Sequence, residues 1–307
     1  MARFVLRRLG FIIVVSLGIV FFSFFGMRMA SNSTSSSPSY DPIPPARYAV
    51  QETVRYMRNL SHGDLGTMLI RRGRRGIQTA VGDIIADTYP KSMGLLLIAL
   101  FVAAAIGLPI GVSAAVHQRS ALSLGTMTLT LLGVSLPSFS VAALLQIAEI
   151  YWYRSFGFRL VPVGGFGWDA HLVIPTLVLA ARPLAYLARI AYMAFSEILD
   201  QDYIRTAHSK GLYQSRVMQD HAYPNAAVPI LTGLGVSLRF SLGSLPVVEY
   251  FLGWPGIGAA LLDAIRNQQA VGVAGMALVL GVTFMLINLL LDVLYRYVDP
   301  RLKEQAI

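Results

Sequence analysis

The chain has 307 residues, of which 55% are hydrophobic and only 13% are charged. This composition is too apolar for an ordinary soluble domain, so it predicts an integral membrane protein. The absence of cysteine excludes disulfides and thiolate metal sites. The net charge is +9, and in a membrane protein the positions of the cations along the chain are more informative than this sum.

Six long apolar segments follow one another along the chain. The first, residues 9–27, follows three arginines and is predicted to be a retained span, with a cleaved signal peptide as the less favoured alternative. The other five are residues 93–116, 124–150 (interrupted by Ser135-Leu136-Pro137-Ser138), 172–193, 228–251 and 271–295. The sequence therefore predicts an all-α membrane protein with six transmembrane helices in a single domain, residues 1–307.

A polar insert, residues 28–92, separates the first two apolar segments. Its Ser-rich and Pro-rich beginning, residues 31–45, is predicted to be a flexible tether. Residues 46–60 have the loose helical spacing of an amphipathic helix on a membrane surface. The basic cluster Arg71-Arg72-Gly73-Arg74-Arg75 is interpreted as a solvated loop, with contact to anionic lipid as the alternative. No aromatic stacking platform accompanies it, so nucleic-acid binding is not expected.

The distribution of Lys and Arg predicts the orientation. With the N-terminus inside, the short inner segments hold eleven cations: Arg3, Arg7, Arg8, Arg119, Arg189, Arg205, Lys210, Arg216, Arg296, Arg301 and Lys303. The short outer loops hold only Arg154, Arg159 and Arg266. By the positive-inside rule, both termini are predicted to be cytoplasmic, and the insert is predicted to be extracytoplasmic.

Residues 194–226 form a polar stretch between the fourth and fifth apolar segments, which we call the elbow. Asp202 to Lys210 is predicted to form a short helix that ends at Gly211, because glycine readily adopts the left-handed conformation of a helix C-terminus. A second helical turn is expected to stop at Tyr223-Pro224, because the residue before a proline is disfavoured in a helix. The elbow is therefore predicted to be a pair of short helices in cytoplasmic water.

The elbow sequence, DYIRTAHSKGL…HAYPNAAVPIL, resembles the cytoplasmic coupling loop of ABC-importer permeases of the dipeptide/oligopeptide/nickel family. That family has Glu-Ala-Ala, then Gly, then a Leu-Pro-like pair. The matching positions here are Arg205-Thr206-Ala207, Gly211 and Tyr223-Pro224, and the leading Glu is absent. Two further stretches, residues 249–258 and residues 288–301, resemble the turn after the fifth span and the last span with its tail.

The resemblance implies the fold of a type I ABC-importer permease, with a cytoplasmic coupling helix, in a prokaryotic plasma (inner) membrane. Such a subunit does no chemistry and has no cofactor of its own, because ATP and magnesium bind to a partner ATPase. The implied partners are a second homologous permease, two ABC ATPase subunits, an extracytoplasmic substrate-binding protein and membrane lipid. The substrate stays open among dipeptides, oligopeptides, nickel chelates and other small solutes. A stand-alone secondary transporter or channel is the alternative, which the scarcity of acidic residues in the spans disfavours.

Coupling to the ATPase is assigned to nine residues of the elbow. They are Asp202, Tyr203, Arg205, Thr206, Ala207, Lys210, Gly211, Pro224 and Asn225. Tyr203 is expected to anchor the contact, Arg205 to pair with a partner carboxylate, and Ala207 to allow close approach of the partner surface.

Outside the elbow, Arg239 lies near the middle of the fifth apolar segment, where a charge is costly unless it is paired or hydrated. Two hypotheses are equally favoured: Arg239 lines the translocation path and meets an anionic group of the substrate, or it bonds to a neighbouring helix. A structural turn after this segment is assigned to Glu249, Trp254, Pro255, Gly256 and Gly258. The five histidines lack metal-ligand spacing and no phosphate-binding loop is found, so no metal site is predicted.

Overall fold

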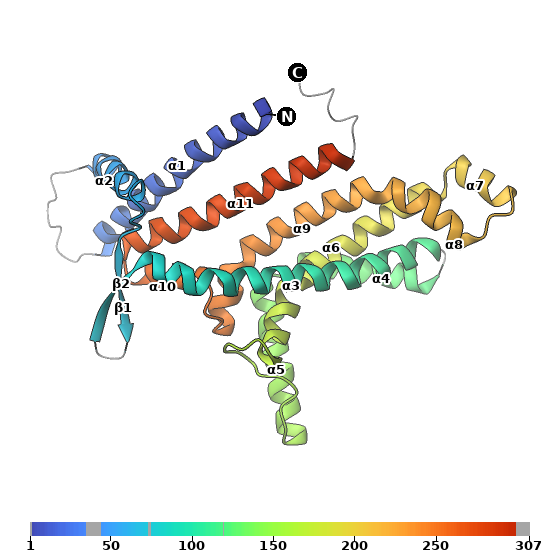
Figure 1. Cartoon of the computed structure of the whole chain (residues 1–307). Coiled ribbons are helices and arrows are strands. Elements are labelled where there is room, and N and C mark those ends of the chain that lie inside the picture. Colours follow the sequence, from blue (N-terminus) through green and yellow to red (C-terminus); the bar gives the residue numbers. More distant parts are fainter. Residues whose placement is uncertain (1, 35–43, 73–74, 119, 299–307) are drawn as a thin grey trace. The chain divides into compact units, whose positions relative to one another are not determined.

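The computed structural model describes residues 2–34, 44–72, 75–118 and 120–298 (Figure 1). Most of the predicted tether, the Gly73-Arg74 part of the basic cluster, Arg119 and the tail from Asp299 lie outside the described residues. The chain divides into two compact units, Met1–Met93 with Pro255–Leu289, and Gly94–Trp254 with Leu290–Ile307.

The first unit is built on two long apolar helices. Its elements are α1 (Ala2–Thr34), α2 (Pro45–Leu60), β1 (Thr67–Arg72), β2 (Arg75–Ala80), the start of α3 (Val81–Val116), α10 (Ile257–Arg266) and most of α11 (Ala270–Val298). Helix α2 confirms the predicted helix in the insert and buries Ala49, Thr53 and Tyr56 along one face. Val50 and Val54 on the same helix are more than half exposed.

Two features of the insert differ from the sequence prediction. Strands β1 and β2 form an antiparallel hairpin in which Arg72 pairs with Arg75, so the basic cluster is not simply a loop but contains the ends of two strands. The short strands lack a run of β-branched residues long enough to be recognised against the arginines. In addition, α1 continues to Thr34 and α3 begins at Val81, so helices occupy both ends of the predicted insert.

The second unit contains the elbow and the helices that support it. Its elements are the rest of α3, α4 (Ala121–Ser135), α5 (Ser138–Phe156), a 3-10 turn (Ala170–Leu172), α6 (Val173–Leu199), α7 (Asp202–Ser209), α8 (Gln214–Val217), a π-helical segment (Met218–Ala222) and α9 (Tyr223–Leu252).

Within the described residues, five helices are long and apolar enough to cross a membrane, or up to six if the bent pair α4 and α5 is one span.

The third predicted span is therefore not a straight helix. Helices α4 and α5 are bent by 107° at a short break. Leu136 has an extended conformation and Pro137, which has no backbone N–H, precedes the first residue of α5. A proline at this point removes one helical hydrogen bond and disfavours the helical conformation of the residue before it, which ends α4.

Helices α3 and α6 approach closely at glycine positions. A Cβ atom added to Gly111 would meet the backbone oxygen of Ala188, and it would lie 2.7 Å from the Cβ of Ala191. Backbone atoms cannot move aside as a flexible side chain can. Small residues that allow helices to approach in this way are typical of packing inside membranes.

A Gly111→Ala substitution is expected to destabilise the protein by about 1–3 kcal/mol, the usual cost of overpacking a close contact. Gly125→Ala is the matched control, because a Cβ atom at Gly125 on α4 would have nothing within 4 Å. Thermal unfolding of both variants in the same detergent measures the difference. Equal melting temperatures would contradict the close packing of α3 on α6.

Candidate functional site

The elbow begins with a short helix whose inner face is apolar. Helix α7 starts after Gln201, which has an extended conformation, and Asp202 in its first turn interacts favourably with the positive end of the helix dipole. Ile204 and Ala207, three residues apart, are its buried residues. The Arg205 Nη1 atom lies 3.4 Å from Asp202 Oδ1, with both side chains largely exposed. Such an exposed pair adds little stability, so Arg205 stays available for another carboxylate.

Gly211 ends α7 as the sequence predicts. Its φ is +80°, a left-handed conformation that favours glycine. The N–H of Gly211 donates to the carbonyl of His208 at 2.9 Å, and the N–H of Leu212 donates to the carbonyl of Ala207 at 3.3 Å. These two bonds form a Schellman motif, which satisfies carbonyls that the end of a helix otherwise leaves open. The turn after α7 is thus fixed by backbone bonds.

A small apolar cluster holds the elbow together. Ile204, Ala207 and Val217 are at most 5% exposed, and Leu199 and Leu212 pack against them. The cluster joins the end of α6 to α7 and α8. Ala207 therefore faces the inside of the elbow, which corrects the expectation that its small side chain offers a surface to a partner.

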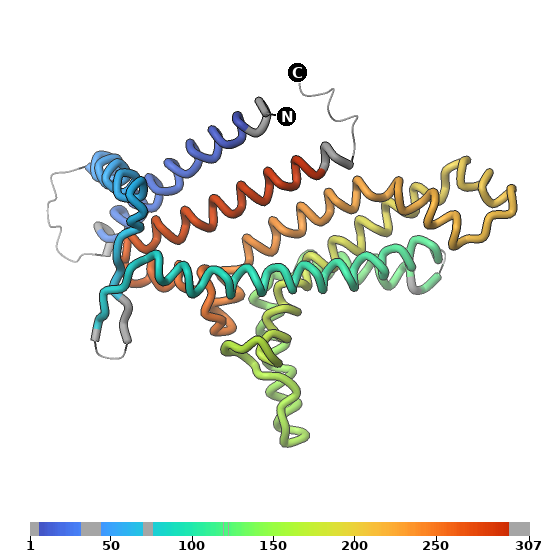
Figure 2. Tube along the Cα trace, in the orientation of Figure 1, coloured from blue at the N-terminus to red at the C-terminus, as the bar shows by residue number. Residues whose placement is uncertain are grey.

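The predicted stop at Tyr223-Pro224 is wrong. Tyr223 has helical angles, and Pro224 lies in the first turn of α9. Residues 214–252 form one continuous helical stretch, which Figure 2 shows as an unbroken coil from the elbow into α9. The π-helical segment Met218–Ala222 directly precedes this proline. Its wider turn accommodates a residue that lacks an N–H, and a proline in a first turn loses no bond that the helix would otherwise make.

Two of the predicted coupling residues are in direct contact. The Asn225 side-chain amide donates to the Tyr203 hydroxyl at 3.3 Å and to the His221 carbonyl at 2.7 Å. The Tyr203 ring also packs edge-on against His221, with a centroid distance of 6.4 Å. These contacts tie α7 to the first turn of α9.

Most of the other assigned residues lie on the outer surface of the elbow. The exposed ones are Asp202, Tyr203, Arg205, Thr206, Lys210, Gly211, Pro224 and Asn225. The Thr206 hydroxyl donates to the carbonyl of Asp202 at 2.9 Å, which directs it along the helix. A polar surface with one aromatic ring and two cations is thus presented by a rigid element, an arrangement suited to binding a protein partner with acidic groups.

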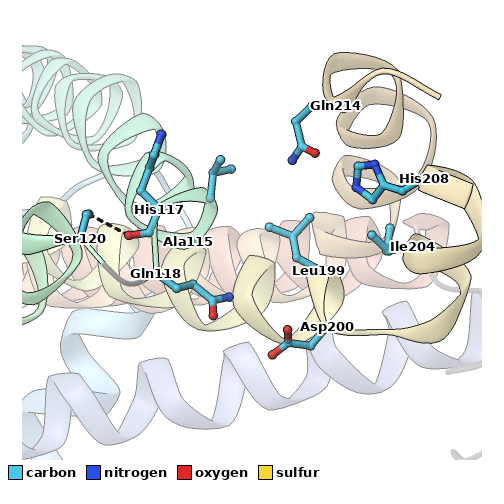
Figure 3. A pocket seen from close by; sticks show the side chains of 10 residues that line it. Ala115, His117, Gln118, Ser120, Leu199, Asp200, Ile204, His208 and Gln214 are labelled. Carbon is cyan, nitrogen blue, oxygen red and sulfur yellow. Dashed lines mark hydrogen bonds between the residues drawn. The ribbon is translucent and has the colours of Figure 1, made fainter. Parts of the chain in front are cut away.

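A cleft beside the elbow was not predicted (Figure 3). It has a volume of about 550 Å³. One wall comes from the end of α3 and the start of α4, including His117 and Ser120, and the other from the elbow, including Asp200, His208 and Gln214. His117 and Ser120 are polar residues directly after an apolar segment. Helix packing places them on the same cleft as His208, and their spacing in the sequence does not predict this.

Arg239 lies on α9 and is exposed in this chain, and the assigned structural turn begins at the end of the same helix. Gly253, with a φ of +67°, ends α9, and the N–H of Trp254 donates to the carbonyl of Glu249 at 2.8 Å. Glu249 and Trp254 are fully buried. The Trp254 ring packs edge-on against Phe166 and Trp168 at centroid distances of 4.8 and 5.6 Å.

The remaining turn residues belong to the first unit. Gly256 precedes α10, and Gly258 lies in the first turn of that helix. The Ile257 N–H between them donates to the Ser92 hydroxyl at 2.8 Å. The assigned turn is therefore divided, because Trp254 ends one compact unit and Pro255 begins the other.

Comparison with known proteins gives a consistent result. The family described as "Binding-protein-dependent transport system inner membrane component" matches residues 107–304. A putative peptide transport system permease protein of Brucella suis is 36% identical over 249 residues, which cover 80% of this chain and 77% of that protein. The dipeptide transport system permease protein DppB of Escherichia coli is 29% identical over 344 residues, covering 99% of this chain and all of that protein. The oligopeptide transport system permease protein AppB of Bacillus subtilis is also 29% identical, with the same coverage.

Proposed function

The chain belongs to the family of binding-protein-dependent transport system inner-membrane components, and on this basis we propose that it is the permease subunit of an ATP-driven importer of peptides or a similar small solute. It is a multi-pass membrane protein. The peptide substrate is proposed because relatives that cover most of the chain are described as peptide, dipeptide or oligopeptide permeases. A stand-alone secondary transporter or channel does not fit this family.

The elbow is the part of the chain that couples to ATP hydrolysis. In this proposal, ATP and magnesium bind to two partner ATPase subunits, which contact the exposed surface of α7. A second homologous permease completes the pathway, and a substrate-binding protein delivers the solute from outside. Both termini then lie in the cytoplasm, in agreement with the excess of Lys and Arg in the short segments on that side.

The observation that carries the proposal is the construction of the elbow. A short exposed helix is fixed at its end by a Schellman motif, held by a buried cluster, and joined without a break to the long apolar helix α9. A flexible loop would absorb a movement of its partner, whereas a fixed helix passes the movement on to α9. Rigid support of this kind is what a contact that transmits force between subunits needs.

Replacing Gly211 tests the proposal. Gly211→Val is expected to lower both co-purification of the ATPase and ATPase activity in lipid, because a left-handed conformation costs a residue other than glycine about 1–2 kcal/mol. A Cβ atom there would have nothing within 4 Å, so any effect comes from the backbone and not from a clash. Gly211→Asn is the matched control, because asparagine tolerates this conformation.

The outcomes separate two claims. If the wild-type chain retains no ATPase, the importer function is wrong. If the wild type retains an active ATPase and Gly211→Val behaves like Gly211→Asn at equal expression, the importer function stands, but the elbow is not its coupling element.

A further inference from the structure

Helices α6 and α9 pack along each other and run antiparallel (Figure 1). Near one end of their contact, Phe195 packs against Tyr223 at a centroid distance of 5.3 Å. Further along, the guanidinium carbon of Arg182 lies 4.2 Å from the centroid of the Phe240 ring. The residue number falls along α6 as it rises along α9, so Arg182 and Phe240 share one level. We call this contact the α6–α9 seam.

Two serines on the buried face of α9 have hydroxyl groups without a hydrogen-bond partner. Ser237 and Ser241 are 0% exposed, and neither hydroxyl makes a hydrogen bond in the structure. They follow Gly233 at intervals of four residues, and a Cβ atom added to Gly233 would lie 3.3 Å from the side chain of Leu187 on α6. Residues four apart share a face of a helix. The two serines therefore continue the face of α9 that contacts α6.

Other hydroxyls on α9 show how a helix usually satisfies such a group. The Thr232 hydroxyl donates to the Val228 carbonyl at 2.9 Å, and the Ser244 hydroxyl donates to the Phe240 carbonyl at 2.9 Å. Each donates to the carbonyl four residues back, which is the common arrangement in helices. A buried hydroxyl that makes no hydrogen bond is costly, because its bonds to water have been lost without replacement. The two buried serines therefore raise the free energy of the conformation in which they lie.

An acceptor without its usual helical donor lies across the seam. Proline has no N–H, so Pro183 inside α6 donates no hydrogen bond to the carbonyl of Leu179. Pro183 is buried and precedes Leu187 by four residues, so it lies on the face of α6 that contacts α9. The Leu179 carbonyl points along α6 toward Pro183, which is next to Arg182. Ser241 follows the ring that Arg182 contacts, so it lies at the same level on α9.

Helix α9 has a wide turn where it leaves the elbow. The π-helical segment Met218–Ala222 directly precedes it. Such segments are rare and are frequently found at functional sites. Exchange of their hydrogen bonds for α-helical ones changes the rise and rotation of the segment, and so displaces the helix that follows. Small displacements of packed helices past each other are a common form of conformational change. The wide turn thus lets α9 slide along α6 while it stays joined to the elbow.

We propose that the α6–α9 seam has two positions, and that Ser237 and Ser241 supply hydrogen bonds only in the second. The structure shows the first position, in which both hydroxyls are buried without a partner. In the second position α9 is displaced along α6, and the two hydroxyls donate to carbonyls of α6, including that of Leu179. A carbonyl oxygen has two lone pairs, so a carbonyl already bonded within α6 also accepts a serine hydroxyl.

The proposal rests on the proposed permease function, because the partner ATPase displaces α9 through the elbow when it binds ATP. The serines destabilise the first position and stabilise the second, so they lower the free energy that the ATPase has to supply. They give the transmembrane part of the chain an element with two discrete arrangements, which is what coupling between distant sites needs.

The first test measures stability and turnover separately. Ser237→Ala, Ser241→Ala and the double variant are assembled with the ATPase, the partner permease and the binding protein. Without ATP, the melting temperature of the complex should rise by about 2 °C in the double variant, because no hydrogen bond is lost in the first position. ATP-dependent peptide uptake in proteoliposomes should fall about tenfold, as expected for the loss of two hydrogen bonds in the second position. A merely structural role would lower both values together.

Two further variants control this test. Ser244→Ala is the matched control, because its hydroxyl is satisfied within α9, and it should leave uptake at the wild-type rate. Pro183→Ala restores an N–H donor to the Leu179 carbonyl and should lower uptake. Combined with Ser241→Ala it should lower uptake no further than either change alone, because both changes remove the same hydrogen bond.

The displacement itself is measured with two spin labels. The chain has no cysteine, so Leu177→Cys on α6 and Thr232→Cys on α9 give two unique labelling sites at exposed positions. These sites lie at different levels of the seam, so sliding changes the distance between them. The distance should shift by about 2 Å when the complex binds an ATP analogue that is not hydrolysed. In the double serine variant a smaller fraction of molecules should show the shifted distance.

The outcomes separate the seam from the permease function. A lower melting temperature in the serine variants would show that the hydroxyls already form bonds in the first position, and would overturn the proposal. Wild-type uptake in the double variant would overturn it too, as would an unchanged label distance in a complex that takes up peptide. In these cases the permease function stands. If the wild-type complex shows no ATP-dependent uptake, the permease function fails, and the proposal fails with it.

Discussion

Replacing Ala207 with Asp is expected to unfold the elbow and abolish stimulation of the partner ATPase, with no loss of the membrane helices. Ala207 is 5% exposed and packs with Ile204 and Val217. A carboxylate at this position would be buried among apolar side chains without a cation. Burying the carboxylate and opening the packed cluster each cost several kcal/mol. That cost exceeds what a cluster of this size contributes to the stability of the elbow.

Hydrogen exchange of the backbone amides measures the effect where it arises. In the wild type, the amides of Lys210, Gly211 and Leu212 donate to the carbonyls of Thr206, His208 and Ala207, so they should be protected. In Ala207→Asp they should exchange freely. Ser209→Asp is the matched control, because it adds the same charge two residues away at an exposed position. Protected amides in Ala207→Asp would contradict the buried cluster.

Trp254→Ala is expected to destabilise the second unit by about 3–5 kcal/mol, the usual cost of removing a large buried aromatic side chain. Trp254 is fully buried, and its ring packs edge-on against Phe166 and Trp168. Phe166 belongs to the loop before α6, whose Gly165 N–H donates to the Leu252 carbonyl at 2.8 Å. Truncation of Trp254 therefore leaves a cavity where the loop and the end of α9 meet.

Two variants sharpen this prediction. Trp254→Phe keeps an aromatic ring against Phe166 and should recover most of the lost stability. Tyr250→Ala, on the same helix but 41% exposed, should cost much less. Thermal unfolding in detergent compares the three. If Trp254→Ala and Tyr250→Ala have the same melting temperature, the aromatic cluster does not stabilise this end of α9.

Elements with strong local signals were predicted well from the sequence. Helix α2, expected over residues 46–60, is Pro45–Leu60, and the last apolar segment, expected over residues 271–295, is Ala270–Val298. Helix α10 was missed because ten residues between a turn and a span are too short to stand out by hydropathy. The hairpin was missed because its strands are short and rich in arginine.

Proline shows why local rules fail at particular places. At Leu136-Pro137 an interruption within one span was expected, and the two helices there are bent by 107°. At Tyr223-Pro224 a stop was expected, yet the helix continues. The dipeptide rule is the same in both cases, and the difference lies in the preceding turn, which is π-helical only before Pro224. The widened turn is a property of several hydrogen bonds and cannot be inferred from the dipeptide.

The candidate site was predictable where it depends on one residue and not where it depends on packing. Gly211 was identified because glycine adopts the left-handed conformation at low cost, and the structure confirms that Gly211 has a positive φ. The orientation of Ala207 was not identified, because a small residue in a short helix suits an inner and an outer face equally. The contact of the Arg182 guanidinium group on α6 with the Phe240 ring on α9 requires the packing of these two helices, which no sequence pattern records.

The prolines of α9 determine where this long helix can bend. Pro224 lies in the elbow and Pro229 just after it, whereas residues 230–245 contain no proline and include Arg239. Bending is therefore favoured near the elbow and again at Pro246, and Pro229 is the point about which the stiffer segment between these two prolines can rotate. Arg239 is ten residues away, about 15 Å at 1.5 Å per residue, so a rotation of about 5° displaces it by about 1 Å. Hydrogen bonds weaken markedly over that distance. A small rotation at the elbow end of α9 is thus enough to break a hydrogen bond made by a side chain in the middle of this helix.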